Sequence, residues 1–415
     1  MILNDTKPPV EADGRTFSVG IVGAGQFANR LAELFRRHPL TGRLFVTDVV
    51  PERAKGLAER VGATTLESFA AMLADDRVDA VAIFTQRWTH GGLAAEALSA
   101  HKHVYSAVPM AVSLPETTEI VDRARNSELI YMLGETSFYN PAVMYARRRY
   151  EQGDFGTVAY SEGDYLHDMD LGFADAYRYS GGRDWRRTAS FPPMLYVSHS
   201  VGGVLGVLPT RAVAVSCFGW ADPVPDGIFE KKTSIFDNDF SNSTALFLLE
   251  DSSVMRINEM RRVGYPAKTR ESRFRFFGTQ ASFEQIATKS LWHTKTTVED
   301  VSDLFDLVSP SRIGAVAPDD RDQSMLKALL SGTAPTQDRT RLPREFDGAP
   351  NGHLGSYQYL VDDFMRAIWS GTPPPIDAFR AADFTVPGIV AHQSAVRGGE
   401  LQLIPDPVPR AGKQC

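Results

Sequence analysis

The chain has 415 residues, of which 43% are hydrophobic and 23% are charged, a composition typical of globular proteins. Its 44 basic and 51 acidic residues give a formal net charge of −7, which argues against nucleic acid or an anionic membrane surface as the main partner. The length predicts two domains, and the two cysteines, Cys217 and Cys415, are too few and too far apart for a disulfide framework or a cysteine-rich metal site.

Residues 1–16 are polar and contain prolines, a pattern that predicts a loose tail. They lack the apolar segment of a secretion signal, and no apolar run in the sequence reaches the length of a membrane span. We therefore expect a cytoplasmic protein that contacts no membrane.

The segment from Phe17 to Phe35 predicts a buried strand, a glycine turn and an amphipathic helix in immediate succession. Gly23, Gly25 and Ala28 follow the strand at the G-x-G-x-x-G/A spacing of dinucleotide-binding folds. The first glycine permits the turn, the second lets the backbone approach a pyrophosphate, and the small third residue lets the helix pack on the strand. The helix N-terminus would then direct its N–H groups at the phosphates. The alternative is an ordinary glycine turn.

Asp48 ends a second apolar strand at residues 44–47 and predicts NAD rather than NADP. A carboxylate at this position can accept hydrogen bonds from both ribose hydroxyls and would repel a 2′-phosphate. Arg53 is the one sign in the other direction, although the sequence around it favours a solvated helix face.

Helices and strands alternate up to residue 134, which predicts a parallel, doubly wound Rossmann sheet in a domain at residues 17–138. Ser113 and Glu116 form a capping box around a proline and indicate a helix start. The expected elements are helices from about residue 52, at 66–73, at 91–100 and from 114, and strands at 80–85, 103–106 and 130–134.

Residues 139–415 predict an α+β domain with a large, open, mainly antiparallel sheet, whose last helices pack back near the first domain. Residues 308–352 are rich in proline, aspartate and arginine and predict a long functional loop or subunit arm with a short helix at 324–330. The other expected elements are helices at 140–152, 357–368 and 378–395, a strand at 157–165, hairpins at 244–260 and 273–286, and an end strand at 401–404.

Several stretches are similar to the Gfo/Idh/MocA family of sugar oxidoreductases, notably GIVGAGQFA at 20–28, DAVAIFTQRWTH at 79–90 and DAFRAADFTVPGIVAHQSAVRGG at 377–399. The resemblance implies an active site where the nicotinamide end of the cofactor meets the second sheet. Dehydrogenases of the family carry Glu-Lys-Pro after the fifth strand, where this chain has Ala107, Val108 and Pro109. The lysine that handles the sugar hydroxyl is therefore absent, which makes an ordinary dehydrogenase of this family less expected.

A narrower resemblance is to the NAD-dependent α-N-acetylgalactosaminidases of the same superfamily. It is carried by AVP at 107–109, GDYLHD at 163–168, YVSHSVG at 196–202 and GHLGSYQYLV at 352–361. The match implies that Tyr165 and His199 are the catalytic pair and that His167 and His353 line the sugar. The glutamate of that family's Glu-Val-Pro is Ala107 here, which leaves the substrate open.

The residue types suit hydrolysis through transient oxidation at C3 of a pyranoside, loss of the C2 proton with departure of the C1 group, addition of water and re-reduction. These steps need bases for the C3 hydroxyl and the C2 proton and an acid for the leaving group. His199, with an unperturbed pKa of about 6.5, can take the hydroxyl proton without a lysine. Tyr165 can take the C2 proton only if neighbours such as Arg261 and Arg262 lower its pKa from about 10.

We expect three groups of site residues. The catalytic residues are Tyr165, His199 and His167. The cofactor contacts are Gly23, Gly25, Gln26, Phe27, Ala28, Asp48, Arg53, Thr85, Trp88, His90, Val108 and Pro109. The substrate contacts are Asp168, Arg261, Arg262, His353 and Tyr357, and no metal ligands are expected.

Ordinary structural roles compete with several of these assignments. A single histidine in a strand, such as His167, is more often structural than catalytic, and Trp88 and His90 fit loop packing as well as cofactor contact. The arginines at 178, 183, 186, 187, 256, 261, 262 and 270 are numerous enough to raise an anionic sugar, such as a uronate, as an option, although solvated or interface roles also fit.

The favoured function is an NAD-dependent glycoside hydrolase that regenerates its cofactor. A sugar dehydrogenase on the same scaffold is the first alternative, and a dinucleotide-binding regulator without turnover is the second. The resemblance also implies a closed homo-oligomer, a dimer or a tetramer.

Overall fold

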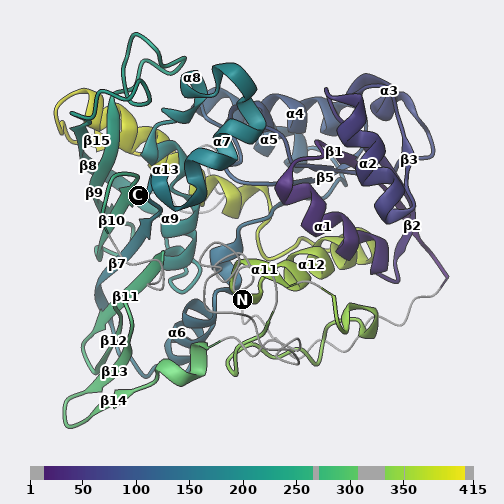
Figure 1. Cartoon of the computed structure of the whole chain (residues 1–415). Coiled ribbons are helices and arrows are strands. Elements are labelled where there is room, and N and C mark those ends of the chain that lie inside the picture. The colour runs from purple at the N-terminus through teal and green to yellow at the C-terminus, as the bar shows by residue number, and fades with distance from the viewer. Residues whose placement is uncertain (1–13, 265–270, 307–331, 350, 407–415) are drawn as a thin grey trace, which may run out of the picture.

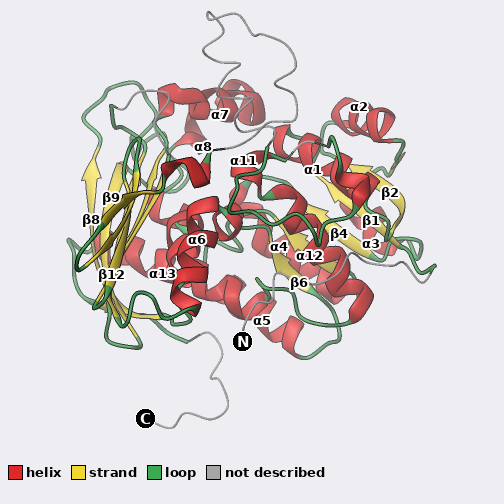
Figure 2. Cartoon of the chain, turned by 90° about the horizontal axis from the view of Figure 1, so that it is seen from below, coloured by secondary structure: helices red, strands yellow, loops and turns green. Residues whose placement is uncertain are grey.

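The computed structural model describes residues 14–264, 271–306, 332–349 and 351–406. Two sheets lie on opposite sides of the molecule with helices between them (Figures 1 and 2). The short helix expected at 324–330 and most of the expected tail lie outside the described residues.

The first sheet is parallel and has the strand order β3-β2-β1-β4-β5-β6, as expected for a doubly wound fold. Its central strand β4 is apolar and buried along its whole length, because helices cover both faces. The strands are β1 (Phe17–Val22), β2 (Thr41–Thr47), β3 (Thr64–Thr65), β4 (Ala80–Ile83), β5 (His103–Ser106) and β6 (Tyr131–Leu133). The helices are α1 (Gln26–Arg37), α2 (Pro51–Val61), α3 (Phe69–Ala74), α4 (His90–Ser99) and α5 (Leu114–Arg125).

Helix α5 begins where the capping box predicts. Ser113 accepts a hydrogen bond from the backbone N–H of Glu116, and the Glu116 carboxylate accepts one from the Ser113 hydroxyl at 2.9 Å. The backbone N–H of Val112 also donates to Glu116, at 3.2 Å. The box thus satisfies N–H groups that would otherwise be left open at the helix start.

The second sheet has nine strands in the order β14-β13-β12-β11-β7-β10-β9-β8-β15. Strands β7 and β10 pair in parallel and the other neighbours are antiparallel, so the sheet is mainly antiparallel as expected. The strands are β7 (Val158–Leu166), β8 (Ala212–Ala221), β9 (Phe240–Leu249), β10 (Val254–Met260), β11 (Ser272–Gly278), β12 (Ala281–Gln285), β13 (Ser290–Thr294), β14 (Val298–Asp300) and β15 (Gln402–Leu403).

Helices on the inner face of this sheet connect it to the first one. Helix α13 (Ala378–Val396) contacts both β8 and α5, and α12 (Tyr357–Ser370) contacts α1. Where α12 contacts α1, Phe35 lies edge-on to Phe364 with ring centroids 6.3 Å apart. The His38 ring, just after α1, lies 3.2 Å from the Asp362 carboxylate. Helix α6 (Pro141–Glu151), α9 (Ser198–Leu205) and the short α11 (Gly352–Gly355) complete this layer.

Between β7 and β8 lie short helices that the sequence did not predict, including α7 (Ala174–Gly181) and α8 (Arg186–Ala189). They build a small apolar cluster of their own around Phe173, Tyr177 and Phe191, separate from the main core. We call residues 168–197 the helical insertion. No helix among the described residues has both the length and the apolar character that crossing a membrane requires.

Candidate active site

The glycine turn between β1 and α1 has the geometry that a bound pyrophosphate needs. Gly23 has φ +89°, and a Cβ there would lie 2.6 Å from the carbonyl oxygen of Phe84, so the position requires glycine. A Cβ on Gly25 would meet nothing within 4 Å, and no side chain caps α1. The first N–H groups of α1 therefore have no side-chain cap, and the turn leaves room at Gly25, so these residues fit a dinucleotide phosphate.

Asp48 lies beside this turn. Its carboxylate accepts hydrogen bonds from the backbone N–H groups of Ala24, at 2.6 Å, and Val50, at 2.8 Å. Each carboxylate oxygen keeps a lone pair for a ribose hydroxyl. Arg53 donates to the carbonyl of Tyr179 at 3.0 Å and lies over its ring, so in this structure Arg53 joins α2 to the helical insertion.

The loop after β4 places its expected cofactor residues in packing contacts. Trp88 lies against Phe236 with ring centroids 5.4 Å apart, and the Thr85 hydroxyl lies 2.7 Å from that of Thr89. The buried His90 ring lies between the carbonyls of Pro109, at 2.9 Å, and Thr85, at 3.2 Å. Burial lowers the pKa of His90 to about 4, so its ring is neutral. The ring connects the loop after β4 to the loop after β5.

Phe27 connects the cofactor turn to the expected sugar residues. Its ring lies 5.7 Å from that of Phe84, 5.4 Å from that of Tyr357 and 6.0 Å from that of His353. Gln26 is exposed, whereas Ala28, Val108 and Pro109 are buried. The side chain that replaces the family's lysine is therefore apolar and enclosed.

The structure brings together the expected catalytic residues, which come from β7, its end and α9. The Tyr165 hydroxyl lies 2.8 Å from Nδ1 of His167, and the rings of Tyr165 and His199 have centroids 4.9 Å apart. A glycine on β7 makes this possible, because a Cβ on Gly163 would lie 2.6 Å from the carbonyl oxygen of Ser200 in α9. His353 also joins the group, with its ring centroid 6.2 Å from that of His199.

His353 has an unusual backbone conformation, with φ 39°. Residues other than glycine rarely adopt the left-handed backbone conformation. Those that do are found preferentially at functional sites. Burial, together with the nearby charges of His199 and Arg30, lowers the pKa of His353 to about 3, so its ring is neutral. A neutral imidazole in this position can accept or donate a hydrogen bond to a sugar hydroxyl.

A hydrogen-bonded chain runs from Glu135 through His199 to Tyr196. Glu135 follows β6, is fully buried, and lies 2.7 Å from Nδ1 of His199; the Tyr196 hydroxyl lies 3.3 Å from Nε2 of the same ring. Burial alone would lower the pKa of His199, but the charges of Glu135 and Tyr196 and the hydrogen bond to Glu135 raise it to about 10. At neutral pH His199 is therefore an imidazolium ion.

Two glutamates and an arginine complete the charged surroundings. Arg261 donates to Glu259 at 2.8 Å, and its guanidinium carbon lies 5.1 Å from the centre of the Tyr165 ring. The Glu271 carboxylate lies 3.9 Å from His167. Burial raises the pKa of Glu259 and of Glu271 to about 7.

Tyr165 does not have the lowered pKa that its expected role as a base requires. Burial and the charges of Glu271 and Tyr196 raise the pKa of Tyr165 well above its ordinary value, and the opposing effect of Arg261 is smaller. Arg262 points elsewhere, because it donates to Asp222 at 2.9 Å and also pairs with Asp226. Tyr165 is thus a protonated phenol at neutral pH, suited to donating a proton.

Other expected substrate residues already have partners in the chain. Asp168 accepts hydrogen bonds from the backbone N–H groups of Asp170, at 2.9 Å, and Val263, at 2.6 Å, so it caps the helical insertion. The arginines also have local partners: Arg178 pairs with Asp175, Arg256 with Glu162, Arg261 with Glu259 and Arg262 with Asp222, while Arg186 donates to the carbonyl of Asp226. Arg270 lies outside the described residues. The arginines with such partners therefore do not by themselves point to an anionic sugar.

Sequence reasoning missed several residues of this site: Glu135, Arg87, Glu259 and Glu271, and Tyr196 except as part of a motif. Glu135 and Arg87 each come shortly after a strand of the first sheet, β6 and β4, and ligands of open α/β sheets bind at those strand ends. That rule was the one available signal for them.

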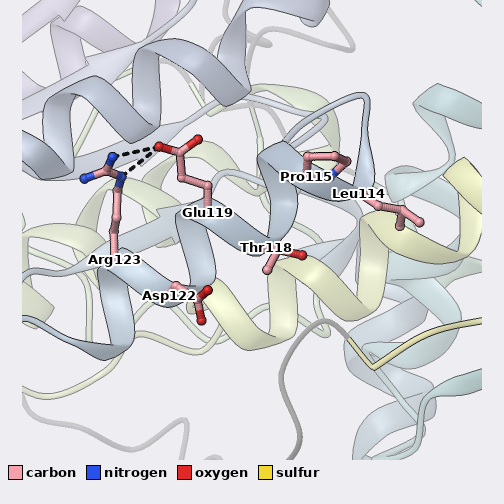
Figure 3. Close-up of a pocket in the computed structure, with 6 residues that line it drawn as sticks. All are labelled: Leu114, Pro115, Thr118, Glu119, Asp122 and Arg123. Atoms are coloured by element: carbon pink, nitrogen blue, oxygen red, sulfur yellow. Dashed lines mark hydrogen bonds and ion pairs between the residues drawn. The ribbon is translucent and has the colours of Figure 1, made fainter.

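The surface hollow in Figure 3 is a different feature. Residues of α5 line it, among them Leu114, Glu119 and Arg123, and Arg123 donates to Glu119 at 2.7 Å. It contains none of the expected site residues. Among the described residues, no group of three or more histidine, cysteine, aspartate or glutamate side chains is arranged to hold a metal ion.

Residues 17–135 match the model of the oxidoreductase family with an NAD-binding Rossmann fold, Gfo/Idh/MocA. NAD as cofactor is therefore confirmed, and so is the resemblance drawn from the sequence motifs.

Proteins similar to this chain include hydrolases. A glycosyl hydrolase family 109 protein of Streptomyces niveus is 25% identical over 94% of this chain and 77% of its own length. An alpha-N-acetylgalactosaminidase of Bacteroides fragilis is 24% identical over 88% of this chain and 83% of its own.

Solved structures share the whole fold. Levoglucosan dehydrogenase in complex with NADH and levoglucosan has a TM-score of 0.70 at 15% identity and covers 94% of this chain and 100% of its own. An oxidoreductase from Agrobacterium radiobacter in complex with NAD⁺, L-tartaric acid and magnesium has a TM-score of 0.70 at 14% identity. The alignment covers 93% of this chain and 98% of that protein's chain.

Proposed function

We propose that the protein is an NAD-dependent glycoside hydrolase that cleaves a glycosidic bond without net oxidation of its substrate. The observation that carries this proposal is the juxtaposition of the Tyr165–His167 pair with the Glu135–His199 ion pair, in a site where the dehydrogenase lysine is replaced by the buried Val108. The similarity, over most of the chain, to a glycosyl hydrolase family 109 protein and to an alpha-N-acetylgalactosaminidase supports the same assignment.

The glycine turn and Asp48 would hold NAD, which when bound would supply reversible hydride acceptance and so make a C–H bond beside the oxidised sugar carbon acidic. The chain's own residues then handle protons. The Tyr165 phenol, kept protonated by burial, donates a proton to the departing group, and the neighbouring His167 holds its hydroxyl in place. His353 and Tyr357 orient the sugar from the cofactor side.

A screen of chromogenic glycosides, including an α-N-acetylgalactosaminide, with and without added NAD⁺ tests this function. We expect cleavage that depends on NAD⁺ and proceeds without NADH accumulation. An uncharged sugar is the first choice, because most arginines of the second domain pair with carboxylates of the chain itself. Accumulation of NADH in step with sugar consumption would contradict the hydrolase proposal.

A sugar dehydrogenase is the second candidate, supported by the shared fold with levoglucosan dehydrogenase. In that case His199 and its partners would replace the missing lysine, and NADH would form stoichiometrically. If neither cleavage nor NADH appears with any sugar while NAD⁺ still binds, the non-catalytic regulator becomes the better reading.

We also propose that the outer face of the second sheet pairs subunits into a homo-oligomer. Large apolar side chains are exposed there on neighbouring strands: Phe218 at 64%, Trp220 at 49%, Leu246 at 52% and Leu248 at 46%. An apolar face of this kind is typical of an interaction surface. A cytoplasmic location remains a prediction from the sequence.

A further inference from the structure

His199 has no ring nitrogen left for a substrate. Its Nδ1 lies 2.7 Å from Glu135 and its Nε2 lies 3.3 Å from the Tyr196 hydroxyl, and the side chain is 5% exposed. A neutral or charged imidazole has two nitrogens and no further proton site. Proton exchange between this ring and a sugar must therefore pass through Tyr196 or break one of these hydrogen bonds.

Tyr196 is the outermost member of the chain that starts at Glu135. Its side chain is half-buried, whereas Glu135 and His199 are buried. The ring lies beside Tyr165, with centroids 6.1 Å apart, and 5.1 Å from the ring of His199. Tyr196 can thus reach the same bound molecule as Tyr165 while keeping its contact with His199.

Arg87 supports the Tyr196 hydroxyl from the other side. It comes from the loop after β4, its guanidinium carbon lies 4.5 Å from the centre of the Tyr196 ring, and its positive charge acts to lower the pKa of Tyr196. Within the described part of the chain, no carboxylate forms an ion pair with Arg87; its other close neighbours are the rings of Phe173 and Tyr177, both at 5.0 Å. A half-buried cation surrounded by rings favours negative charge on a neighbouring hydroxyl.

We propose that Tyr196 is the proton acceptor of the site, placed between the His199 imidazolium and Arg87, and that Arg87 is the positioning residue that stabilises the Tyr196 phenolate. In this step the bond between a substrate hydroxyl oxygen and its proton breaks, the electron pair stays on the sugar oxygen, and the proton forms a new O–H bond with Tyr196. The transfer itself needs no oxidant. The identity of the substrate rests on the proposed function, but the state of Tyr196 does not.

The electrostatic surroundings of Tyr165 and Tyr196 support different roles, with Tyr165 as proton donor and Tyr196 as proton acceptor. Burial alone would raise the pKa of Tyr196, but the positive charges of His199 and Arg87 overcome this and lower it below its ordinary value. The pKa of Tyr165 is raised instead, by burial and by Glu271. Because Tyr196 and His199 share a hydrogen bond, the two groups titrate as a pair, and the proton resides on the imidazole. The charged or titratable groups around Tyr196 are Arg87, Glu135, Tyr165, Tyr177, His199, Arg261 and Tyr357.

Tyrosinate absorbance, followed against pH in the full chain with NAD⁺, tests the proposal without any substrate. The difference between the wild type and Tyr196→Phe should show one tyrosine ionising below the ordinary pKa of about 10. Tyr177→Phe is the matched control, since Tyr177 contacts the same arginine, is buried and has no hydrogen bond to His199. The control should leave the early ionisation in place. An early ionisation that persists in Tyr196→Phe, or is absent from the wild type, overturns the proposal.

Arg87 is tested by its effect on that ionisation. Arg87→Met should move it to higher pH, and Arg87→Lys should restore part of the change, an effect that loss of packing would not produce. With a cleaved glycoside in hand, Tyr196→Phe should lower kcat by about 10² or more while NAD⁺ affinity stays within twofold. If the wild type cleaves nothing, the proposed function fails, and the absorbance titration still decides whether Tyr196 ionises early.

Discussion

The ion pair between Glu135 and His199 yields a prediction that needs no substrate. In Glu135→Gln the imidazole loses the carboxylate that keeps it charged, while it remains buried. The side chains involved are 0% and 5% exposed, so breaking the pair should cost about 3–5 kcal/mol of unfolding free energy, the range for an uncompensated buried charge. Because the amide has nearly the same shape as the carboxylate, this substitution keeps the packing, and the measured difference reports the effect of the charge alone.

The cost of Glu135→Gln should depend on pH with a definite sign. The pKa of His199 is raised from 6.5 to about 10 in the folded protein, so its pairing stabilises the fold fully below pH 6.5 and the contribution is lost as pH rises toward 10. Urea unfolding of wild type and variant at several pH values should therefore give a difference that is largest near pH 6 and shrinks toward pH 10. The same substitution in a His199→Asn background should lack this trend. A difference that stays constant with pH in the wild-type background would refute the reasoning.

Three further predictions concern the cofactor, the sheet and the assembly. NAD⁺ should bind at least tenfold more tightly than NADP⁺, about 1.4 kcal/mol, and Asp48→Ala should narrow the gap in titration calorimetry; equal affinities in the wild type would contradict the ribose assignment. Gly163→Ala should destabilise the protein by about 1–3 kcal/mol in thermal unfolding, because its Cβ would lie 2.6 Å from the Ser200 carbonyl; an unchanged melting temperature would show that α9 can move away. Light scattering at micromolar concentration should show a dimer or tetramer that Phe218→Glu dissociates, and a monomeric wild type would count against pairing through the exposed sheet face.

Much of the fold could be predicted from the sequence because its signals are local. The glycine spacing around Gly23, the capping box at Ser113 and the alternation along β9 each reflect contacts within a few residues or with one neighbouring strand. The short helices of the helical insertion escaped prediction because they are held by packing around Phe173 rather than by a periodic face.

The site was only partly predictable, because charge effects depend on which direction a side chain points. Arg261 and Arg262 are adjacent in the sequence, yet one lies over Tyr165 and the other pairs with Asp222. The motif identified Tyr165 and His199, but their pKa values are set by burial and by charged residues that are distant in the sequence and close in space. Glu135 lies 64 positions away from His199 in the sequence, so although its place after a strand marked it as a candidate, its pairing with His199 could be found only from the three-dimensional structure.

Glycoside cleavage in D₂O, with NAD⁺ present, tests the central claim most directly. If the enzyme cleaves by transient oxidation with removal of the C2 proton, the released sugar should carry deuterium at C2 and no NADH should accumulate. Cleavage that leaves the original hydrogen at C2 would contradict the proposed route, and steady production of NADH with an oxidised sugar would show a dehydrogenase instead.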